Sequence, residues 1–114
     1  MRKAGAFATF FFVMLTDLPA LASGSLDGNG LLPKCEAEVK TDGLTAKDYQ
    51  AAAYCQGLVR VVVGMSLDIN IPEDATLDQG CRVVLLYLQN HPEELHKSDY
   101  FLVHEALRKA FPAK

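Results

Sequence analysis

The cleanest helical pattern of apolar positions in the chain lies between Thr76 and His91. The pattern consists of Leu77, Cys81, Val84, Leu85 and Leu88, at positions i, i+4, i+7, i+8 and i+11. This spacing places all five side chains on one face of an α-helix. Thr76 is followed three positions later by Gln79, which is the capping-box pattern at a helix start. The segment therefore predicts a helix that begins at Leu77.

Further apolar residues widen this stripe beyond one face of the helix. They are Val83, Leu86 and Tyr87. A helix that is apolar around much of its circumference is buried on more than one side. The pattern predicts either a central helix in the fold or a helix whose second side is covered by another subunit of a homodimer.

Two helices are predicted before this one. Residues 23–29 are rich in Gly, Ser and Asp and are expected to form a flexible leader. Apolar spacing then predicts a short helix over about residues 31–39. Thr45 and Asp48 form a second capping pattern, from which a helix is expected to run to about Met65. Its apolar stripe consists of Tyr49, Ala52, Ala53, Cys55, Val59, Val62 and Val63.

The C-terminal part of the chain predicts a helical turn and a last helix. His91-Pro92 marks a break, and proline suits the first turn of a short helix. Ser98 is placed to cap a last helix that runs to about Ala110, and Pro112 ends it. The buried face expected for this helix is Phe101, Val103, Ala106, Leu107, Ala110 and Phe111.

Two segments of the chain are also compatible with β-strands. Residues 58–63 and 83–88 are rich in β-branched side chains, and periodicity alone does not separate a buried strand from a buried piece of helix. Residue propensity favours the all-α alternative. The fold class predicted is all-α, a small bundle of four or five helices in one domain.

The N-terminal segment has the organisation of a secretory signal peptide. Arg2 and Lys3 precede an apolar run over residues 4–15, and Ala20-Leu21-Ala22 is a small-x-small cleavage site. The apolar run is too short to span the roughly 30 Å hydrocarbon layer of a membrane. We expect cleavage after Ala22, which leaves residues 23–114 as the exported domain without a membrane span.

Composition and charge exclude several classes of protein. The chain of 114 residues is 50% apolar and 22% charged, which is close to the globular average and argues against disorder. The net charge is −3, so the chain lacks the basic surface that holds a nucleic acid backbone. No nucleic acid partner is therefore expected.

Catalytic and metal-binding patterns are weak in this sequence. His91 and His96 are five positions apart, which is not the i, i+4 spacing of a helical ligand pair. Glu93 and Glu94 are adjacent, and adjacent side chains on a helix do not converge as an acid and a base. Cys55 lies on an apolar helical face, where an inert core thiol or half of a disulfide is expected. The sequence predicts no enzyme, no metal site and no cofactor.

Three cysteines remain after the predicted cleavage: Cys35, Cys55 and Cys81. An exported domain lies where disulfides persist, and a small domain gains much from one. Because the number is odd, at most one intramolecular pair forms and one thiol is left over.

Four short motifs occur together in the exported domain. They are Cys55-Gln56-Gly57, Ile71-Pro72-Glu73, the stretch from Tyr87 to Glu93, and Ala110-Phe111-Pro112. With an exported leader and the early Cys35, this combination resembles the Tai (Rap/Tai) family of immunity proteins. The resemblance covers about residues 31–112. It implies a small all-helical periplasmic protein, associated with type VI secretion, that binds and blocks a peptidoglycan amidase effector.

The chain departs from the pattern of this family at three positions. Val61 stands where a second glycine is frequent, and Asn70 and Ala113 stand where cysteines are frequent. The two missing cysteines are consistent with the loss of one complete bridge. The resemblance therefore implies that Cys35 and Cys55 form the remaining disulfide. It assigns no role to Cys81. We expect a buried, poorly reactive thiol there, and an intersubunit disulfide is the alternative.

The expected mechanism is steric, in which a loop enters the cleft of the enzyme. The predicted partner-binding residues are Asp68, Glu73 and Asp74 before the central helix, and His91, Glu93 and Glu94 after it. Both segments connect capped helices and carry charges that the core does not need. For Asp68, Glu73 and Asp74, the alternative is an ordinary solvated acidic loop without a partner. A periplasmic helical chaperone without a fixed effector is the alternative function.

Overall fold

The computed structural model describes residues 26–114, which form helices and connecting loops. The elements in order are α2 (Gly28–Val39), α3 (Ala46–Met65), α4 (Leu77–Asn90), the 3-10 turn η2 (Pro92–Glu94) and α5 (Asp99–Ala110). Within these residues the only β-type pairings are two isolated bridges, Asp27 with Ser98 and Ile69 with Pro112. The predicted all-α class is confirmed, and the β-strand alternative for residues 58–63 and 83–88 is wrong.

The predicted signal peptide, residues 1–22, lies outside the described part of the chain, and so does its cleavage site. Export therefore stays a prediction. Among residues 26–114, no helix has the length and apolar character needed to cross a membrane.

Side-chain caps fix where the helices begin. Thr45 and Thr76 each form the predicted capping box, and the Ser98 hydroxyl accepts from the Phe101 amide at the start of α5. The prediction for α2 is wrong by one turn, because the supposed leader already contains a cap. Asp27 accepts a hydrogen bond from the Gly30 amide at 3.1 Å, so α2 begins at Gly28.

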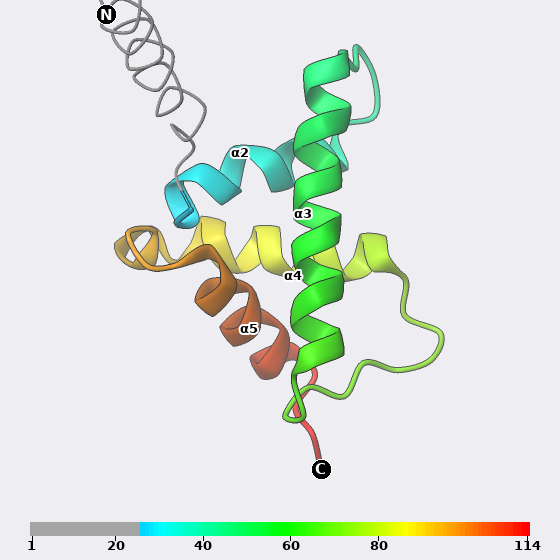
Figure 1. Ribbon diagram of the computed structural model, residues 1–114, viewed down its shortest axis with the longest axis vertical. Helices are drawn as coiled ribbons and strands as arrows, with labels where there is room; N and C mark the ends of the chain where they lie inside the picture. Colours follow the sequence, from blue (N-terminus) through cyan, green and yellow to red (C-terminus); the bar gives the residue numbers. More distant parts are fainter. Residues whose placement is uncertain (1–25) are drawn as a thin grey trace, which may run out of the picture.

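Helix α4 lies at the centre of the fold and packs against α2, α3 and α5 (Figure 1). Tyr87 is buried on its widened stripe, whereas Leu86 is 59% exposed. The predicted central position is confirmed within one chain, and the homodimer stays a prediction. The buried core consists of Leu31, Cys35, Cys55, Val59, Val62, Ile69, Cys81, Val84, Leu85, Tyr87, Leu88, Leu102, Val103, Ala106 and Leu107.

The buried face of α5 differs from the predicted one. Leu102, Val103, Ala106 and Leu107 are buried, but Phe101 is 42% exposed. Consecutive residues on a helix point about 100° apart, so the run of apolar residues at the start of α5 contains more side chains than one face can bury. Packing selects the stripe that includes Leu102, and Phe101 is left at the surface.

Three of the other residues predicted to be buried are also exposed, and one of them is Ala53 of α3. Ala110 at the end of α5 is exposed, and Tyr49 is 63% exposed in the first turn of α3. Figure 1 shows the N-terminal end of α3 extending beyond α4, and the first buried residue of α3 is Cys55.

A buried carboxylate joins the start of α5 to α3. Asp99 is 7% exposed and accepts a hydrogen bond of 2.6 Å from the Tyr54 hydroxyl. The bond to Asp99, together with burial, raises the pKa of Tyr54 to about 12. The Lys34 ammonium lies 3.8 Å from the centre of the Tyr54 ring. These contacts hold the first turn of α5 in a defined position.

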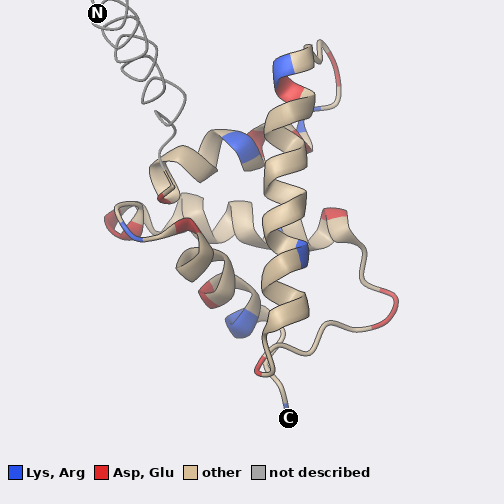
Figure 2. Cartoon of the chain, in the orientation of Figure 1, with Lys and Arg blue, Asp and Glu red and all other residues tan. Residues whose placement is uncertain are grey.

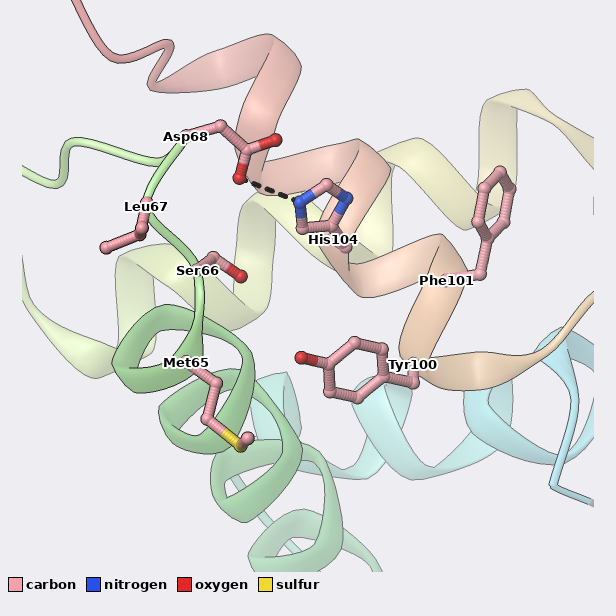
Figure 3. A pocket seen from close by; sticks show the side chains of 7 residues that line it. All are labelled: Met65, Ser66, Leu67, Asp68, Tyr100, Phe101 and His104. Carbon is pink, nitrogen blue, oxygen red and sulfur yellow. Dashed lines mark hydrogen bonds and ion pairs between the residues drawn. The ribbon is translucent and has the colours of Figure 1, made fainter.

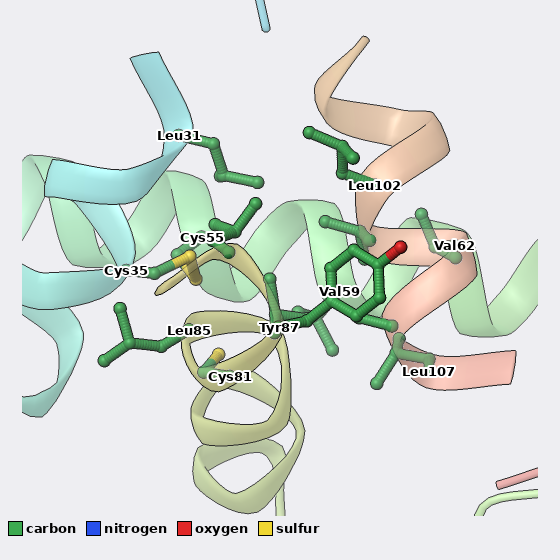
Figure 4. Close-up of a cluster of buried hydrophobic side chains, with 14 of the residues drawn as sticks. Leu31, Cys35, Cys55, Val59, Val62, Cys81, Leu85, Tyr87, Leu102 and Leu107 are labelled. Atoms are coloured by element: carbon green, nitrogen blue, oxygen red, sulfur yellow. A yellow bond between two sulfur atoms is a disulfide. The ribbon is translucent and has the colours of Figure 1, made fainter. Parts of the chain in front are cut away.

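The disulfide implied by the resemblance is present. Cys35 of α2 and Cys55 of α3 are bonded, with their Cα atoms 5.4 Å apart, and both residues are fully buried (Figure 4). Because these two helices pack directly on each other, the bond fastens an existing helix–helix contact.

We expect Cys81 to resist thiol reagents in the folded protein. The residue is fully buried, and desolvation, followed by the charges of Glu38 and Asp78, raises the pKa of its thiol to about 12. Because the thiolate is the reactive form, labelling at pH 8 should be slower than in the unfolded chain by at least about a hundredfold. The measurement is the labelling rate with a bulky disulfide reagent, with and without guanidinium. Rapid labelling without denaturant would show that Cys81 is accessible.

Candidate partner-binding surface

The connection between α3 and α4, residues 66–76, is fixed at its root to the end of the chain. The Asn70 amide donates to the Phe111 carbonyl at 2.8 Å, and the Ala113 amide donates to the Asp68 carbonyl at 3.3 Å. Ile69 lies between these bonds and is buried in the core. The first half of the connection is therefore attached to the segment that follows α5.

The second half of the connection forms an exposed acidic turn. The Ala75 amide donates to the Pro72 carbonyl at 3.0 Å, which leaves Glu73 and Asp74 at the centre of the turn. Both residues are exposed, and neither carboxylate forms a hydrogen bond or ion pair within residues 26–114. Figure 2 shows this acidic turn at the outer bend of the loop, away from the helices. Thr76 then caps α4, so the turn is held at both ends.

Asp68 is already engaged within the molecule. Its carboxylate lies 2.9 Å from Nε2 of His104 on α5, and its side chain is 51% exposed. The bond to His104 lowers the pKa of Asp68 below its ordinary value. Asp68 thus differs from Glu73 and Asp74, because it fastens the root of the loop to α5.

The remaining predicted residues, His91, Glu93 and Glu94, lie at the opposite end of α4. The helix has 14 residues, which corresponds to a length of about 20 Å. The predicted partner-binding residues therefore lie on two separate surfaces, one at each end of α4 (Figure 1). A single loop inserted into an enzyme cleft would not include both groups.

Two of these three residues, His91 and Glu94, form contacts with Tyr87 of α4 or with Lys97. Nδ1 of His91 lies 2.8 Å from the Tyr87 carbonyl oxygen, and the two rings stack with centroids 4.0 Å apart. The Tyr87 hydroxyl donates to Glu94 at 2.9 Å, and the Lys97 ammonium lies 3.0 Å from the same carboxylate. The bonds from Lys97 and Tyr87 lower the pKa of Glu94. Glu93 is the exposed member of the three.

This cluster is also the place among the described residues where a metal ion would find suitable ligands. One ligand atom each from His91, Glu93 and Glu94 lies within 4.8 Å of the others. Zinc ligands bind at about 2.0–2.2 Å, so side chains must move closer before they share an ion. Both Glu94 oxygens are already bonded, to Lys97 and to Tyr87. The arrangement fits a solvated ion-pair network better than a prepared metal site.

A surface that the sequence analysis missed lies beside the root of the loop. Residues from the end of α3, the first residues of the loop and one side of α5 surround an open hollow of about 600 Å³. Its lining is Met65, Ser66, Leu67, Asp68, Tyr100, Phe101 and His104. Figure 3 shows the Tyr100 side chain extending from α5 toward the end of α3, where Met65 lies, and the Asp68–His104 pair spanning from the loop to α5.

The apolar side chains of this hollow are unusually exposed. Leu67 is 99% exposed, Met65 74%, Phe101 42% and Tyr100 40%. Two features of the sequence point to it in retrospect. The run of apolar residues at the start of α5 is too wide for one helix face, and Leu67 stands between two polar residues just after the α3 helix ends. Contiguous exposed apolar side chains mark surfaces that bind a partner.

Comparison with known protein families identifies the chain. The family model of Rap1a immunity proteins matches residues 27–113, which is nearly the whole described domain.

The chain belongs to the Rap1a immunity protein family.

Rap1a is the Tai-type immunity family, so the resemblance recognised in the sequence is confirmed at this level. No curated protein and no solved structure matches the chain. Membership in the Rap1a family implies that the chain acts by binding a partner effector rather than by catalysis. The acidic turn and the apolar hollow are the two candidates for the surface that binds this partner.

Proposed function

We propose that this Rap1a-family chain is a periplasmic immunity protein that binds a peptidoglycan amidase delivered by type VI secretion and occludes its active site. The observation that carries the proposal is the family match over residues 27–113. The acidic turn at Glu73 and Asp74 supports it, because this turn projects from the fold and is held at both ends.

The proposed mechanism needs no chemistry from the immunity protein. The acidic turn enters the cleft of the amidase and denies it to the peptidoglycan strand. The fixed root, bonded through Asn70 and Asp68 to the end of the chain, limits the conformational entropy that ordering the loop would cost. Glu73 and Asp74 pair with cationic or hydrogen-bond-donating groups around the cleft.

The proposed location follows from the target and from the cysteine chemistry. Peptidoglycan lies outside the inner membrane, so protection is needed in the periplasm. A disulfide between Cys35 and Cys55 persists in that oxidising compartment. The signal peptide expected at residues 1–22 supplies the route of export.

A periplasmic chaperone is the second candidate function, and the exposed apolar hollow favours it. Side chains such as Leu67 and Met65 suit unfolded apolar segments as well as a folded partner. The two functions differ in stoichiometry. An immunity protein forms a fixed complex with one enzyme, whereas a chaperone binds many unfolded clients weakly.

The test is peptidoglycan digestion by each purified type VI amidase of the source genome, with and without the purified exported domain. We expect one enzyme to lose its activity at equimolar domain, with a stable complex in calorimetric titration. Full activity of every amidase at excess domain would remove the immunity function. Weak binding to several unfolded proteins would then favour the chaperone.

Charge reversal at the acidic turn should slow association. In the variant Glu73→Lys/Asp74→Lys, we expect the association rate with the inhibited amidase to fall by about tenfold at low salt, because charges at the interface steer the encounter. The effect should shrink as salt is added. Both residues are exposed, so the free energy of unfolding should change by no more than about 0.5 kcal/mol. The measurement is stopped-flow association at several salt concentrations.

The matched control for this experiment is Glu36→Lys/Asp42→Lys. It changes the net charge equally at two exposed residues of α2 and of the α2–α3 connection. If both variants slow association equally, net charge is responsible and the acidic turn has no special role.

A further inference from the structure

We propose that the apolar hollow formed by Met65, Leu67, Tyr100 and Phe101 is the anchoring site for the effector, which inserts an apolar side chain flanked by lysine or arginine. The inference rests on the proposed immunity function and extends it, because the sequence analysis assigned partner binding to charged residues alone. The acidic turn would then block the cleft while the hollow holds the enzyme in place.

The first argument concerns what these side chains do for the fold. Met65 and Leu67 are largely exposed, so burial in the core does not account for them. Methionine and aromatic residues are enriched in the centres of protein interfaces, where a few of them carry most of the binding energy. No hydrogen bond within residues 26–114 uses the Tyr100 hydroxyl, so it is free to bond to a partner.

The second argument concerns rigidity. The Asp68–His104 pair at 2.9 Å bridges the two sides of the hollow, since Asp68 belongs to the loop and His104 to α5. The neighbouring Asp99–Tyr54 bond at 2.6 Å holds the first turn of α5 on α3. Because the hollow is held in shape before binding, less conformational entropy is lost when a partner fills it.

The third argument concerns the charge that the partner must carry. Residues 66–76 contain three carboxylates and neither lysine nor arginine. The Asp68 carboxylate lies on the lining of the hollow, and the bond to His104 holds its pKa low, so it is ionised at neutral pH. Of the three carboxylates, only Asp68 lines the hollow, whereas Glu73 and Asp74 lie on the acidic turn outside it. A partner that fills the hollow therefore meets the Asp68 carboxylate on its loop side, which favours an apolar group with a lysine or arginine beside it.

The same charge argues against a second copy of this chain as the occupant. In a two-fold symmetric dimer centred on the hollow, the same patch of each subunit faces the other. Such a dimer would bring the two Asp68 carboxylates, one from the lining of each subunit, toward each other. Like charges brought together at an interface are unfavourable, so a cationic heterologous partner fits better.

The experiment compares Leu67→Ser and Met65→Ser with Leu86→Ser in complex formation with the amidase that the wild-type domain inhibits. Leu86 is an exposed leucine on α4, 59% exposed and outside the hollow, so it is a matched control. The double variant Met65→Ser/Leu67→Ser should raise Kd by about 30-fold or more, mainly through faster dissociation. Leu86→Ser should leave Kd within about twofold of wild type.

Three other outcomes would overturn the inference and are distinguishable. If the complex forms and the double variant binds like wild type, the hollow is not the anchor although the immunity function stands. If no type VI amidase of the source genome binds the wild-type domain, the proposed function fails and takes the inference with it. If sedimentation shows that the free domain is a dimer which Leu67→Ser dissociates, the occupant is a second copy.

Discussion

Loss of the Cys35–Cys55 disulfide is expected to lower the free energy of unfolding by about 3 kcal/mol. The bond closes a loop between residues 20 positions apart, and loop-closure estimates give about this value for the entropy removed from the unfolded chain. Small domains are stable by roughly 5–15 kcal/mol in total, so this is a large fraction. The measurement is guanidinium unfolding of the double variant Cys35→Ala/Cys55→Ala beside the wild-type domain.

Reductant supplies the control for this prediction. Reductant should destabilise the wild-type domain and the variant Cys81→Ala by the same amount, because Cys81 is not part of the bond. It should have no effect on the double variant, which has no bond to reduce. A double variant as stable as the oxidised wild type would show that helix packing alone holds α2 on α3.

Replacement of Gly28 by alanine is expected to cost about 1–3 kcal/mol of unfolding free energy. A Cβ atom at this position would lie 2.6 Å from Cδ1 of Leu102 and 2.9 Å from the Leu95 Cα atom. Backbone does not move aside as a flexible side chain does, so the first turn of α2 must shift away from its neighbours. That shift would strain the bond from the Gly28 amide to the Lys97 carbonyl.

Gly57 provides a control of opposite sign. It lies within α3, and a Cβ atom added there would meet nothing within 4 Å outside its own helix. Gly57→Ala should therefore stabilise the domain by about 0.5–1 kcal/mol, because alanine is the better helix former. Thermal or guanidinium unfolding of both variants gives the comparison. Equal effects of the two substitutions would contradict the close approach at Gly28.

Local interactions explain which parts of the fold the sequence predicts well. The starts of α3, α4 and α5 were predicted correctly, because the caps at Thr45, Thr76 and Ser98 each act on residues only three positions away. The start of α2 differs from the prediction, because composition places Asp27 in a flexible leader whereas its side chain caps the helix. The disulfide followed from the family resemblance rather than from spacing, since three cysteines alone leave the pairing open.

The acidic turn at Glu73 and Asp74 is also visible in the sequence, because proline and acidic residues between two capped helices predict an exposed connection. The second predicted group, at His91, Glu93 and Glu94, is equally visible. The distance between the two groups is not visible in the sequence, because it depends on the direction and length of α4. The assignment of these residues to partner binding stays a prediction.

The sequence by itself determined the helical class, the family and the starts of three of the four α-helices among residues 26–114. Tertiary structure decided which apolar residues stay at the surface. Phe101 and Leu102 are neighbours of similar hydrophobicity, and only the way α5 packs on α3 and α4 buries one and exposes the other. The hollow between Met65 and Tyr100 exists for the same reason. Its residues lie far apart in sequence, and burial is a property of the packed helices rather than of any single segment.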